Sequence, residues 1–295
     1  MIQERLFIVG CPRSGTTLLQ SLLAAHSTIW TCPETFFFGK TVSKKRLHRW
    51  LGLSSKTAKH SFGEILDAIG IDNTRIDPPQ PDYLMRSYAD AFVRLLDYAA
   101  AKEKKRVWVE KTPIHLYYIK HIRRYIPEAK FVHVIRNGPD VVASFYEVTH
   151  TYPDVWGGAK DVDGCIRRWN ADIRKTARYI HHRKHYVVRH EDLTADPRST
   201  VSQLCDWIGL PFEEDCLFKY RDMDQRIVDR TEHWKADITK PITTGTETKF
   251  KTLFDTKTQR YIAEQLSRAT MNEIIDHVHR RDRILSADMH RGIEP

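Results

Sequence analysis

The residues with the clearest chemical meaning form a short segment near the N-terminus, Gly10-Cys-Pro-Arg-Ser-Gly-Thr-Thr17. Its spacing matches a phosphate-binding loop, G-x-x-x-x-G-K-[ST], except that Thr16 stands at the lysine position. The backbone N–H groups of such a loop, with the start of the helix that follows, bind anions. Without the lysine the loop suits a phosphate but is poorly equipped to neutralise a triphosphate. Arg13 supplies a cation at a different position.

A turn that contains Gly and Ser can also be purely structural. Here a strand-like apolar segment at 5–9 precedes the turn, and a helix-forming run at 17–25 follows it. This order of strand, loop and helix is the one that a phosphate site requires, so it favours the functional interpretation.

A second anion site is predicted at Arg136, which follows a strand-like segment at 130–135. Ser144 lies eight residues later, on the helix that we expect next. Ligands of open α/β sheets bind at the carboxyl ends of the strands, and a guanidinium group matches the oxygens of a phosphate. An ordinary alternative pairs Arg136 with Asp140 and leaves Ser144 on a helix surface. Two anion sites at one sheet edge favour a ligand with phosphates at two ends.

Two charged residues are candidates for the chemistry. Glu34 precedes three aromatic residues at 36–38, and a carboxylate in such surroundings can act as a general base with a pKa raised by desolvation. Lys111 leaves a strand at 106–109 and is placed to stabilise developing negative charge. In the alternative interpretation, Glu34 is a solvated loop residue or lies next to a helix N-cap, and residues 36–38 are ordinary core. The alternative for Lys111 is an exposed lysine paired with Glu110. We expect His115 on the surface of the following helix.

The elements that must position these residues alternate between strand-like and helix-like segments. Because parallel strands need crossover connections, usually helices, the pattern predicts an α/β fold, a three-layer sandwich with a parallel sheet. We expect one domain over 1–295, with a helical insertion at about 40–105 and a C-terminal helix at about 256–281. The remaining predicted segments are strands at 130–135 and 185–188, and helices at 113–125, 141–148 and 197–208.

Three segments together resemble the sulfotransferases that use 3′-phosphoadenosine 5′-phosphosulfate (PAPS). Residues 11–17 resemble the loop that binds the 5′-phosphosulfate, in the Arg-containing form of carbohydrate, tyrosyl-protein and bacterial members. Residues 134–144 are similar to the 3′-phosphate motif of the family. Residues 186–193 resemble the segment on which the adenosine rests. The resemblance covers about residues 5–210 and implies a fold like that of phosphate-loop nucleoside triphosphatases.

The resemblance also implies roles for individual residues. Glu34 would be the catalytic base, and Lys111 with Arg13 would stabilise the transferred sulfuryl group. Members with a histidine base carry it two residues after the lysine, where this chain has Pro113. The implied cofactor-binding residues are Arg13, Ser14, Gly15, Thr16 and Thr17 for the 5′-phosphosulfate, Arg136 and Ser144 for the 3′-phosphate, His190 in place of a usual Tyr beside the adenosine, and Lys235 in a segment that could close over the nucleotide.

Composition narrows the class of protein further. The 295 residues carry 47 Lys and Arg against 38 Asp and Glu, a formal charge of +9, which favours an anionic partner. No apolar run approaches the roughly 20 residues of a membrane-spanning helix, and the N-terminus leaves no room for a signal peptide. Five scattered cysteines indicate reduced thiols, a cytoplasmic location and no metal site. Contact with a membrane surface stays open, whereas scattered basic residues argue against a nucleic-acid partner.

These observations predict an enzyme that transfers a sulfuryl group from PAPS to an acceptor hydroxyl. The acceptor pocket is expected at 40–105 and 145–165, whose aromatic and basic residues suit a glycan, a lipid, a phenol or another small alcohol. Two rivals remain: a small-molecule kinase of the phosphate-loop class, and a basic protein that binds an anionic partner without catalysis.

Overall fold

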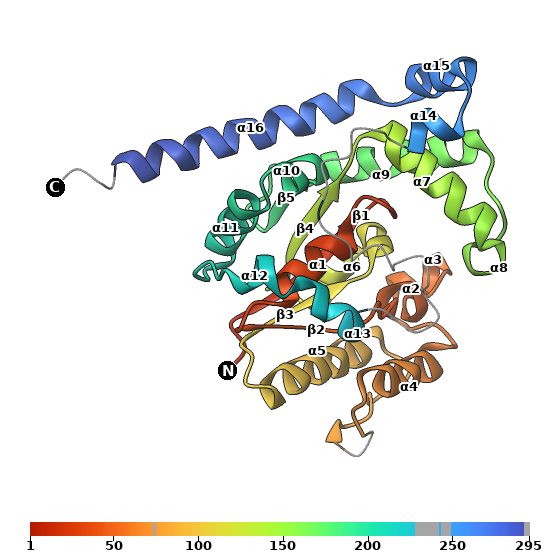
Figure 1. Cartoon of the computed structure of the whole chain (residues 1–295). Coiled ribbons are helices and arrows are strands. Elements are labelled where there is room, and N and C mark those ends of the chain that lie inside the picture. Colours follow the sequence, from red (N-terminus) through yellow and green to blue (C-terminus); the bar gives the residue numbers. More distant parts are fainter. Residues whose placement is uncertain (73–74, 228–241, 243–248, 292–295) are drawn as a thin grey trace.

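The computed structural model describes residues 1–72, 75–227, 242 and 249–291 (Figure 1). Within them, five parallel strands form one sheet in the order β2-β3-β1-β4-β5. The predicted α/β class is therefore confirmed. The strands are β1 (Glu4–Gly10), β2 (Ile29–Thr31), β3 (Val107–Lys111), β4 (Lys130–Ile135) and β5 (His185–Arg189).

Strand β2 is the one strand that the sequence pattern did not indicate. It has only three residues, Ile29-Trp-Thr31, which is too short for a recognisable alternation of apolar and polar side chains. Its pairing with β3 makes it a strand, with Thr31 opposite Val109.

One face of the sheet is covered by α1 (Thr16–Ala24) and α11 (Pro197–Ile208). Leu6 and Ile8 of β1 point to this face, where Leu19 and Leu22 of α1 lie in the same buried cluster. Four short elements contact these two helices. Helix α11 is contacted by α10 (His190–Ala195), and α1 is contacted by α12 (Asp215–Phe218), η3 (Tyr220–Met223) and α13 (Asp224–Ile227).

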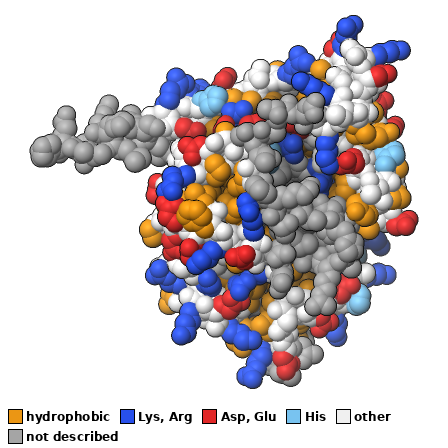
Figure 2. All heavy atoms as spheres, viewed as in Figure 1, with side chains coloured by type: hydrophobic (Ala, Val, Ile, Leu, Met, Phe, Trp, Pro, Cys, Tyr) orange, Lys and Arg blue, Asp and Glu red, His pale blue; other side chains and the backbone are white. Residues whose placement is uncertain are grey.

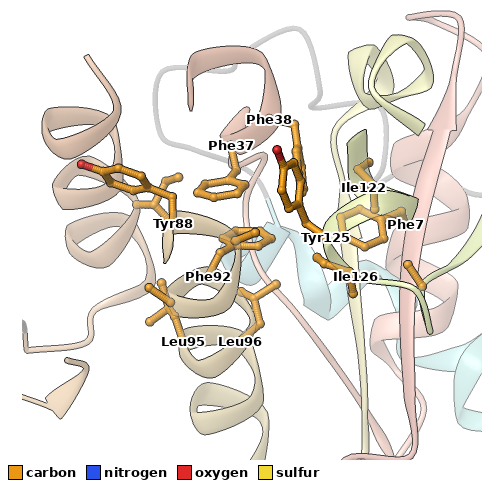
Figure 3. Close-up of a cluster of buried hydrophobic side chains, with 14 of the residues drawn as sticks. Phe7, Phe37, Phe38, Tyr88, Phe92, Leu95, Leu96, Ile122, Tyr125 and Ile126 are labelled. Carbon is orange, nitrogen blue, oxygen red and sulfur yellow. The ribbon is translucent and has the colours of Figure 1, made fainter. Parts of the chain in front are cut away.

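The opposite face is covered by a second buried cluster around Phe7 of β1 (Figure 3). Phe92 of α5 (Met85–Lys102) and Ile122 of α6 (Ile119–Tyr125) belong to it. The elements before α5 are α2 (Phe37–Thr41), α3 (Arg46–Trp50) and α4 (Ala58–Ile69), and η2 (Pro113–Tyr117) precedes α6. Because α5 packs against β2 and β3, it is part of the layer that covers the sheet.

A third cluster lies beyond β4 and β5. It is formed by α7 (Gly138–Thr151), α9 (Val162–Ala177), α15 (Thr256–Gln265) and α16 (Arg268–Arg291), with α8 (Pro153–Trp156) and α14 (Lys249–Leu253) beside them. Residues 256–281, expected as one helix, contain the break between α15 and α16, where Leu266 takes an extended conformation. Figure 1 shows α16 running along the edge of the molecule toward the C-terminus.

Two histidines are buried in the layer between the sheet and α9. His133 and His185 share a hydrogen bond of 2.8 Å, and the His185 ring stacks between Phe131 and Tyr179. Burial lowers the pKa of His133 to about 3. Burial, together with His133, lowers the pKa of His185 to about 2. Both rings are therefore neutral over the whole range in which the protein is expected to be folded.

These pKa values predict that stability falls in mild acid. An unfolded histidine has a pKa of about 6.5, so the unfolded chain takes up protons first as the pH drops below that value. The free energy of unfolding should decrease between about pH 6.5 and pH 4, on the order of 1–2 kcal/mol per histidine by pH 5. The double variant His133→Phe/His185→Phe keeps the ring stack and should show a shallower dependence in urea unfolding. An unchanged slope would contradict this assignment.

Candidate active site

The register of four parallel strands brings the predicted site residues to one edge of the sheet. Lys111 lies opposite Ile8 of β1, and Gly10 of β1 lies opposite Val134 of β4. The segments that follow β2, β3, β1 and β4 therefore leave the sheet side by side. Glu34, the loop at 10–17 and Arg136 lie in the segments after β2, β1 and β4, and Lys111 is the last residue of β3.

The loop at 10–17 joins β1 to α1 as the sequence predicts. Arg13 and Gly15 both have positive φ angles, 72° and 90°, which turn the backbone tightly before the helix. A Cβ atom at Gly15 would lie 2.3 Å from Nδ1 of His190, so glycine is required there by both conformation and space. Helix α1 has no side-chain cap, and its first N–H groups remain available for an anion.

The side chain of Ser14 gives a second, independent sign of an anion at this loop. Ser14 is fully buried, and its Oγ has no hydrogen-bond partner among the described residues. A buried hydroxyl without a partner costs free energy, so such groups usually mark a ligand or water position. Thr16 is also buried, and Thr17 is partly buried, at the first two positions of α1.

Arg13, Arg136 and Ser144 lie together. The Nε of Arg13 donates to Oγ of Ser144 at 3.1 Å, and Nη1 of Arg136 donates to the backbone oxygen of Arg13 at 3.4 Å. The alternative partner, Asp140, is 3.6 Å from Nη2 of Arg136. This ion pair leaves Nε of Arg136 buried and without a partner among the described residues. The two predicted anion sites are thus in direct contact.

His190 lies at the start of α10, against the phosphate loop. Burial, and next the nearby Arg136, lower the pKa of His190 to about 4, so the ring is neutral at pH 7. Its Nδ1 is buried and has no partner among the described residues. Next to it, Glu191 accepts hydrogen bonds from the backbone and side-chain nitrogens of Asn137, which join the start of α7 to that of α10.

Glu34 and Lys111 form an ion pair between their side chains. The Lys111 side chain is fully buried, and that of Glu34 is 11% exposed. The alternative for Lys111 is wrong, because its side chain is not exposed and its ion pair is with Glu34. Glu34 is not solvated either, but Phe37 and Phe38 are core residues, as the alternative for this segment supposes. The sequence interpretation attributed the environment of Glu34 to neighbouring aromatic rings. The structure instead places an ammonium group against the carboxylate.

The segment that contains Glu34 is anchored on both sides. Before it, Nε2 of Gln20 donates to Thr31 and to the backbone oxygen of Cys32, both at 2.8 Å. After it, Phe37 and Phe38 enter the buried cluster of Figure 3. Phe37 stacks on Phe92 with 4.0 Å between ring centroids.

A buried network under this segment involves residues that the sequence interpretation missed. Glu110 is fully buried and accepts hydrogen bonds from the hydroxyls of Thr35 at 2.8 Å and Thr112 at 2.5 Å, and from Nδ1 of His115 at 2.9 Å. Nε2 of His115 accepts from the backbone N–H of Phe38 at 3.2 Å. Since Nε2 is an acceptor, the ring proton lies on Nδ1 and points to Glu110.

The expectation that His115 lies on a helix surface is wrong, because its side chain is fully buried. Burial raises the pKa of Glu110, but the neighbouring His115 and the hydrogen bonds from His115, Thr112 and Thr35 outweigh burial and lower it. One signal in the sequence could have revealed the network. A carboxylate in a strand covered on both faces requires hydrogen-bond donors, and Thr112 and His115 follow Glu110 by two and five residues.

One predicted site residue, Lys235, lies outside the described residues. No helix in the described ranges combines the length and the apolar character that a membrane span needs. The same residues contain no group of three or more His, Cys, Asp or Glu side chains that could hold a metal ion. All five cysteines are buried and free of disulfides.

The described residues form an α/β fold whose first strand leads into a loop with the spacing of a phosphate loop and with Thr16 at the lysine position. The model of the sulfotransferase family matches residues 5–214. The chain therefore belongs to the sulfotransferase family.

Individual relatives are distant. An uncharacterized protein of Aquifex aeolicus (strain VF5) is 28% identical over 224 residues, which are 73% of this chain and 27% of that protein. Protein-tyrosine sulfotransferase A of Caenorhabditis elegans is 22% identical over 246 residues, 80% of this chain and 58% of the relative. The mouse sulfotransferase SULT7A1, solved in complex with PAP, has the same fold, with a TM-score of 0.50, 11% identity and coverage of 89% and 82%. The chain thus spans only part of the curated relatives.

Substituting Glu110→Gln should destabilise the protein, because glutamine offers one acceptor oxygen and its NH2 group must then face a donor. We expect a loss of about 1–3 kcal/mol in the free energy of unfolding, measured with urea. Glu64→Gln is the matched control, since Glu64 forms an exposed ion pair with Lys40 at 2.9 Å and should cost less than about 1 kcal/mol. Equal effects of the two substitutions would show that the network does not stabilise the fold.

Proposed function

We propose that this protein is a sulfotransferase that uses PAPS and transfers the sulfuryl group to an acceptor hydroxyl, with Glu34 as the general base. The observation that supports it most is the contact between two predicted anion sites at one sheet edge, beside a buried pair of Glu34 and Lys111. A nucleotide with phosphates at its 3′ and 5′ ends fits two such sites, and PAP, the product that PAPS leaves, is the ligand in the mouse neighbour.

The described residues fit this co-substrate. The loop offers backbone N–H groups and the unpartnered hydroxyl of Ser14 for the 5′-phosphosulfate. Nε of Arg136, which has no partner in the described part of the chain, and the hydroxyl of Ser144 suit the 3′-phosphate. His190, neutral and with a free Nδ1, can hydrogen-bond to the nucleoside or stack on it. PAPS would supply the sulfuryl group, already activated by its bond to a phosphate leaving group.

Glu34 is suited to take the acceptor proton. The neighbouring ammonium of Lys111 favours the ionised carboxylate, which is the form that accepts a proton. The small exposed fraction of Glu34, 11%, leaves room for an acceptor hydroxyl at the carboxylate. Protonation of Glu34 would weaken its ion pair with Lys111, because the carboxyl group would lose its negative charge.

Lys111 and Arg13 then stabilise negative charge. As Glu34 becomes neutral, its ion pair with the Lys111 ammonium weakens, and the positive charge of Lys111 can act on the oxygens of the transferred group and its leaving phosphate. Because Lys111 is buried, its positive charge is poorly screened by water, which increases its effect on developing charge. Arg13 lies in the phosphate loop itself. Its positive φ angle turns the backbone there, and its Nε donates a hydrogen bond to Oγ of Ser144.

Replacing Glu34 by Gln should lower kcat by roughly 10² to 10⁴, the range for loss of a general base, without weakening PAP binding. Initial rates with PAPS and a panel of phenol, alcohol and sugar acceptors measure the first quantity, and calorimetric titration of PAP the second. Glu4→Gln is the control, because Glu4 forms a partly buried ion pair with Lys130 far from the site. An unchanged rate would remove Glu34 from the mechanism.

Replacing Arg136 by Ala should weaken PAP binding by about tenfold or more, because a charge-assisted hydrogen bond to phosphate is lost. Binding of adenosine 5′-phosphate, which has no 3′-phosphate, should change by less than about twofold. The control is Arg198→Ala, which removes an exposed ion pair with Glu214. If both nucleotides lost affinity equally, Arg136 would not recognise the 3′-phosphate.

A further inference from the structure

The segment between Glu34 and Glu64 differs from the rest of the chain in its charge. Over the whole chain Lys and Arg only modestly outnumber Asp and Glu, 47 to 38, and Figure 2 shows both kinds of side chain intermixed over the visible face. Residues 35–63 contain no Asp or Glu. Their basic residues are Lys40, Lys44, Lys45, Arg46, Arg49, Lys56 and Lys59.

The centre of this segment is α3, a helix with no buried residue. Leu47, Trp50 and Leu51 are 63%, 75% and 50% exposed, and their spacing of three and four residues puts them on one side of the helix. The exposed residues Lys44, Lys45 and Arg46 precede them directly, and in the described part of the chain these three form no ion pair. We call these six residues the α3 surface.

The α3 surface is held in place by hydrogen bonds to the backbone of the same segment. Nη1 of Arg49 donates to the backbone oxygens of Ser43 and Lys44, at 3.1 and 2.6 Å. The backbone N–H of Leu53 donates to the oxygen of His48 at 2.8 Å. Large apolar side chains are thus presented to solvent by an ordered turn, so their exposure needs an explanation beyond chain flexibility.

We propose that the α3 surface docks on a lipid bilayer that contains anionic lipids. Lys and Arg are attracted to the negative headgroups, and Trp and Leu enter the boundary between headgroups and acyl chains. A stable protein interface buries about 20–30 residues on each side around a core poor in charge. The α3 surface has three apolar residues, flanked by positive charges that form no ion pair with any residue the structure describes. A bilayer therefore fits its size and charge better than a protein partner does.

Docking would orient the active site. Helix α2, which directly follows the Glu34 segment, contacts η2. The backbone N–H of Ser55, after α3, donates to the backbone oxygen of Thr41 in α2. The α3 surface is thus built onto the segment that contains the proposed base. On the basis of the proposed function, the acceptor would be a hydroxyl of a lipid or of a molecule anchored at the membrane surface.

Co-sedimentation of the full chain with vesicles tests docking without any measurement of activity. Vesicles of phosphatidylcholine with phosphatidylserine should bind the protein, and binding should weaken as salt increases. Vesicles of phosphatidylcholine alone should bind it much less. The variants Lys44→Glu/Lys45→Glu/Arg46→Glu and Leu47→Ser/Trp50→Ser/Leu51→Ser should each lose about tenfold or more in vesicle affinity.

Two control variants match these changes elsewhere on the surface. Lys251→Glu/Lys257→Glu/Arg260→Glu makes the same change of charge at exposed positions of α14 and α15, and Phe218→Ser removes a side chain that is 73% exposed. Both should bind vesicles as the original chain does. Equal losses in the controls would mean that net charge or general hydrophobicity, and not the α3 surface, drives binding.

Two further measurements keep the outcomes distinct. Brominated acyl chains should quench the fluorescence of the original chain more than that of Trp50→Phe, and equal quenching would overturn the insertion of Trp50. Sedimentation that shows a dimer, dispersed by the Leu47→Ser/Trp50→Ser/Leu51→Ser variant, would identify a second copy as the occupant instead. PAP titration of each variant checks its fold, and it tests the proposed function separately from docking.

Discussion

The burial of the Lys111 ammonium at the carboxyl end of β3 is the constraint on which the rest of the site depends. A buried cation is tolerated only with an anion beside it, and Glu34 supplies that anion. To bring Glu34 there, the chain must pair β2 with β3, and Gln20 must hold the turn after β2. Glu110, also buried and charged, holds the other end of the same turn through Thr35. Two buried charges on one strand thus fix the position of the proposed base.

The residues around the phosphate loop differ from Glu110 and Lys111 in whether their buried polar atoms have partners. Around the phosphate loop, polar atoms of Ser14, Arg136 and His190 are buried without partners among the described residues, whereas Glu110 pairs with His115 and Lys111 with Glu34. A folded protein keeps such unpartnered groups at a cost, and a bound anion would remove that cost. The side of the site with Glu34 and Lys111 is therefore suited to proton transfer and charge stabilisation, and the side with the phosphate loop to nucleotide binding. Strand β1 lies between the two and joins them.

The sequence allowed the α/β class, the phosphate loop and the neighbourhood of Arg136 and Ser144 to be predicted, because each depends on local patterns at strand ends. Strand β2 could not be predicted, since three residues have no periodicity and become a strand only through pairing with β3. His115 was misplaced for a related reason. Its burial depends on Glu110 and on the backbone of Phe38, which is 77 residues away in the sequence. Glu110 is close to His115 in the sequence, but the contact with Phe38 arises only in the folded chain, so local sequence shows only part of this network.

The most direct test of the account is a thermal-shift titration of the original chain with PAP, adenosine 5′-phosphate and Mg-ATP in parallel. A ligand at 100 times its Kd adds about 2.7 kcal/mol of apparent stability, which should raise Tm by several degrees. The account predicts a clear shift with PAP, a smaller one with adenosine 5′-phosphate and little with Mg-ATP, since Thr16 replaces the lysine of a triphosphate site. A shift with Mg-ATP and none with PAP would contradict it and favour phosphoryl transfer.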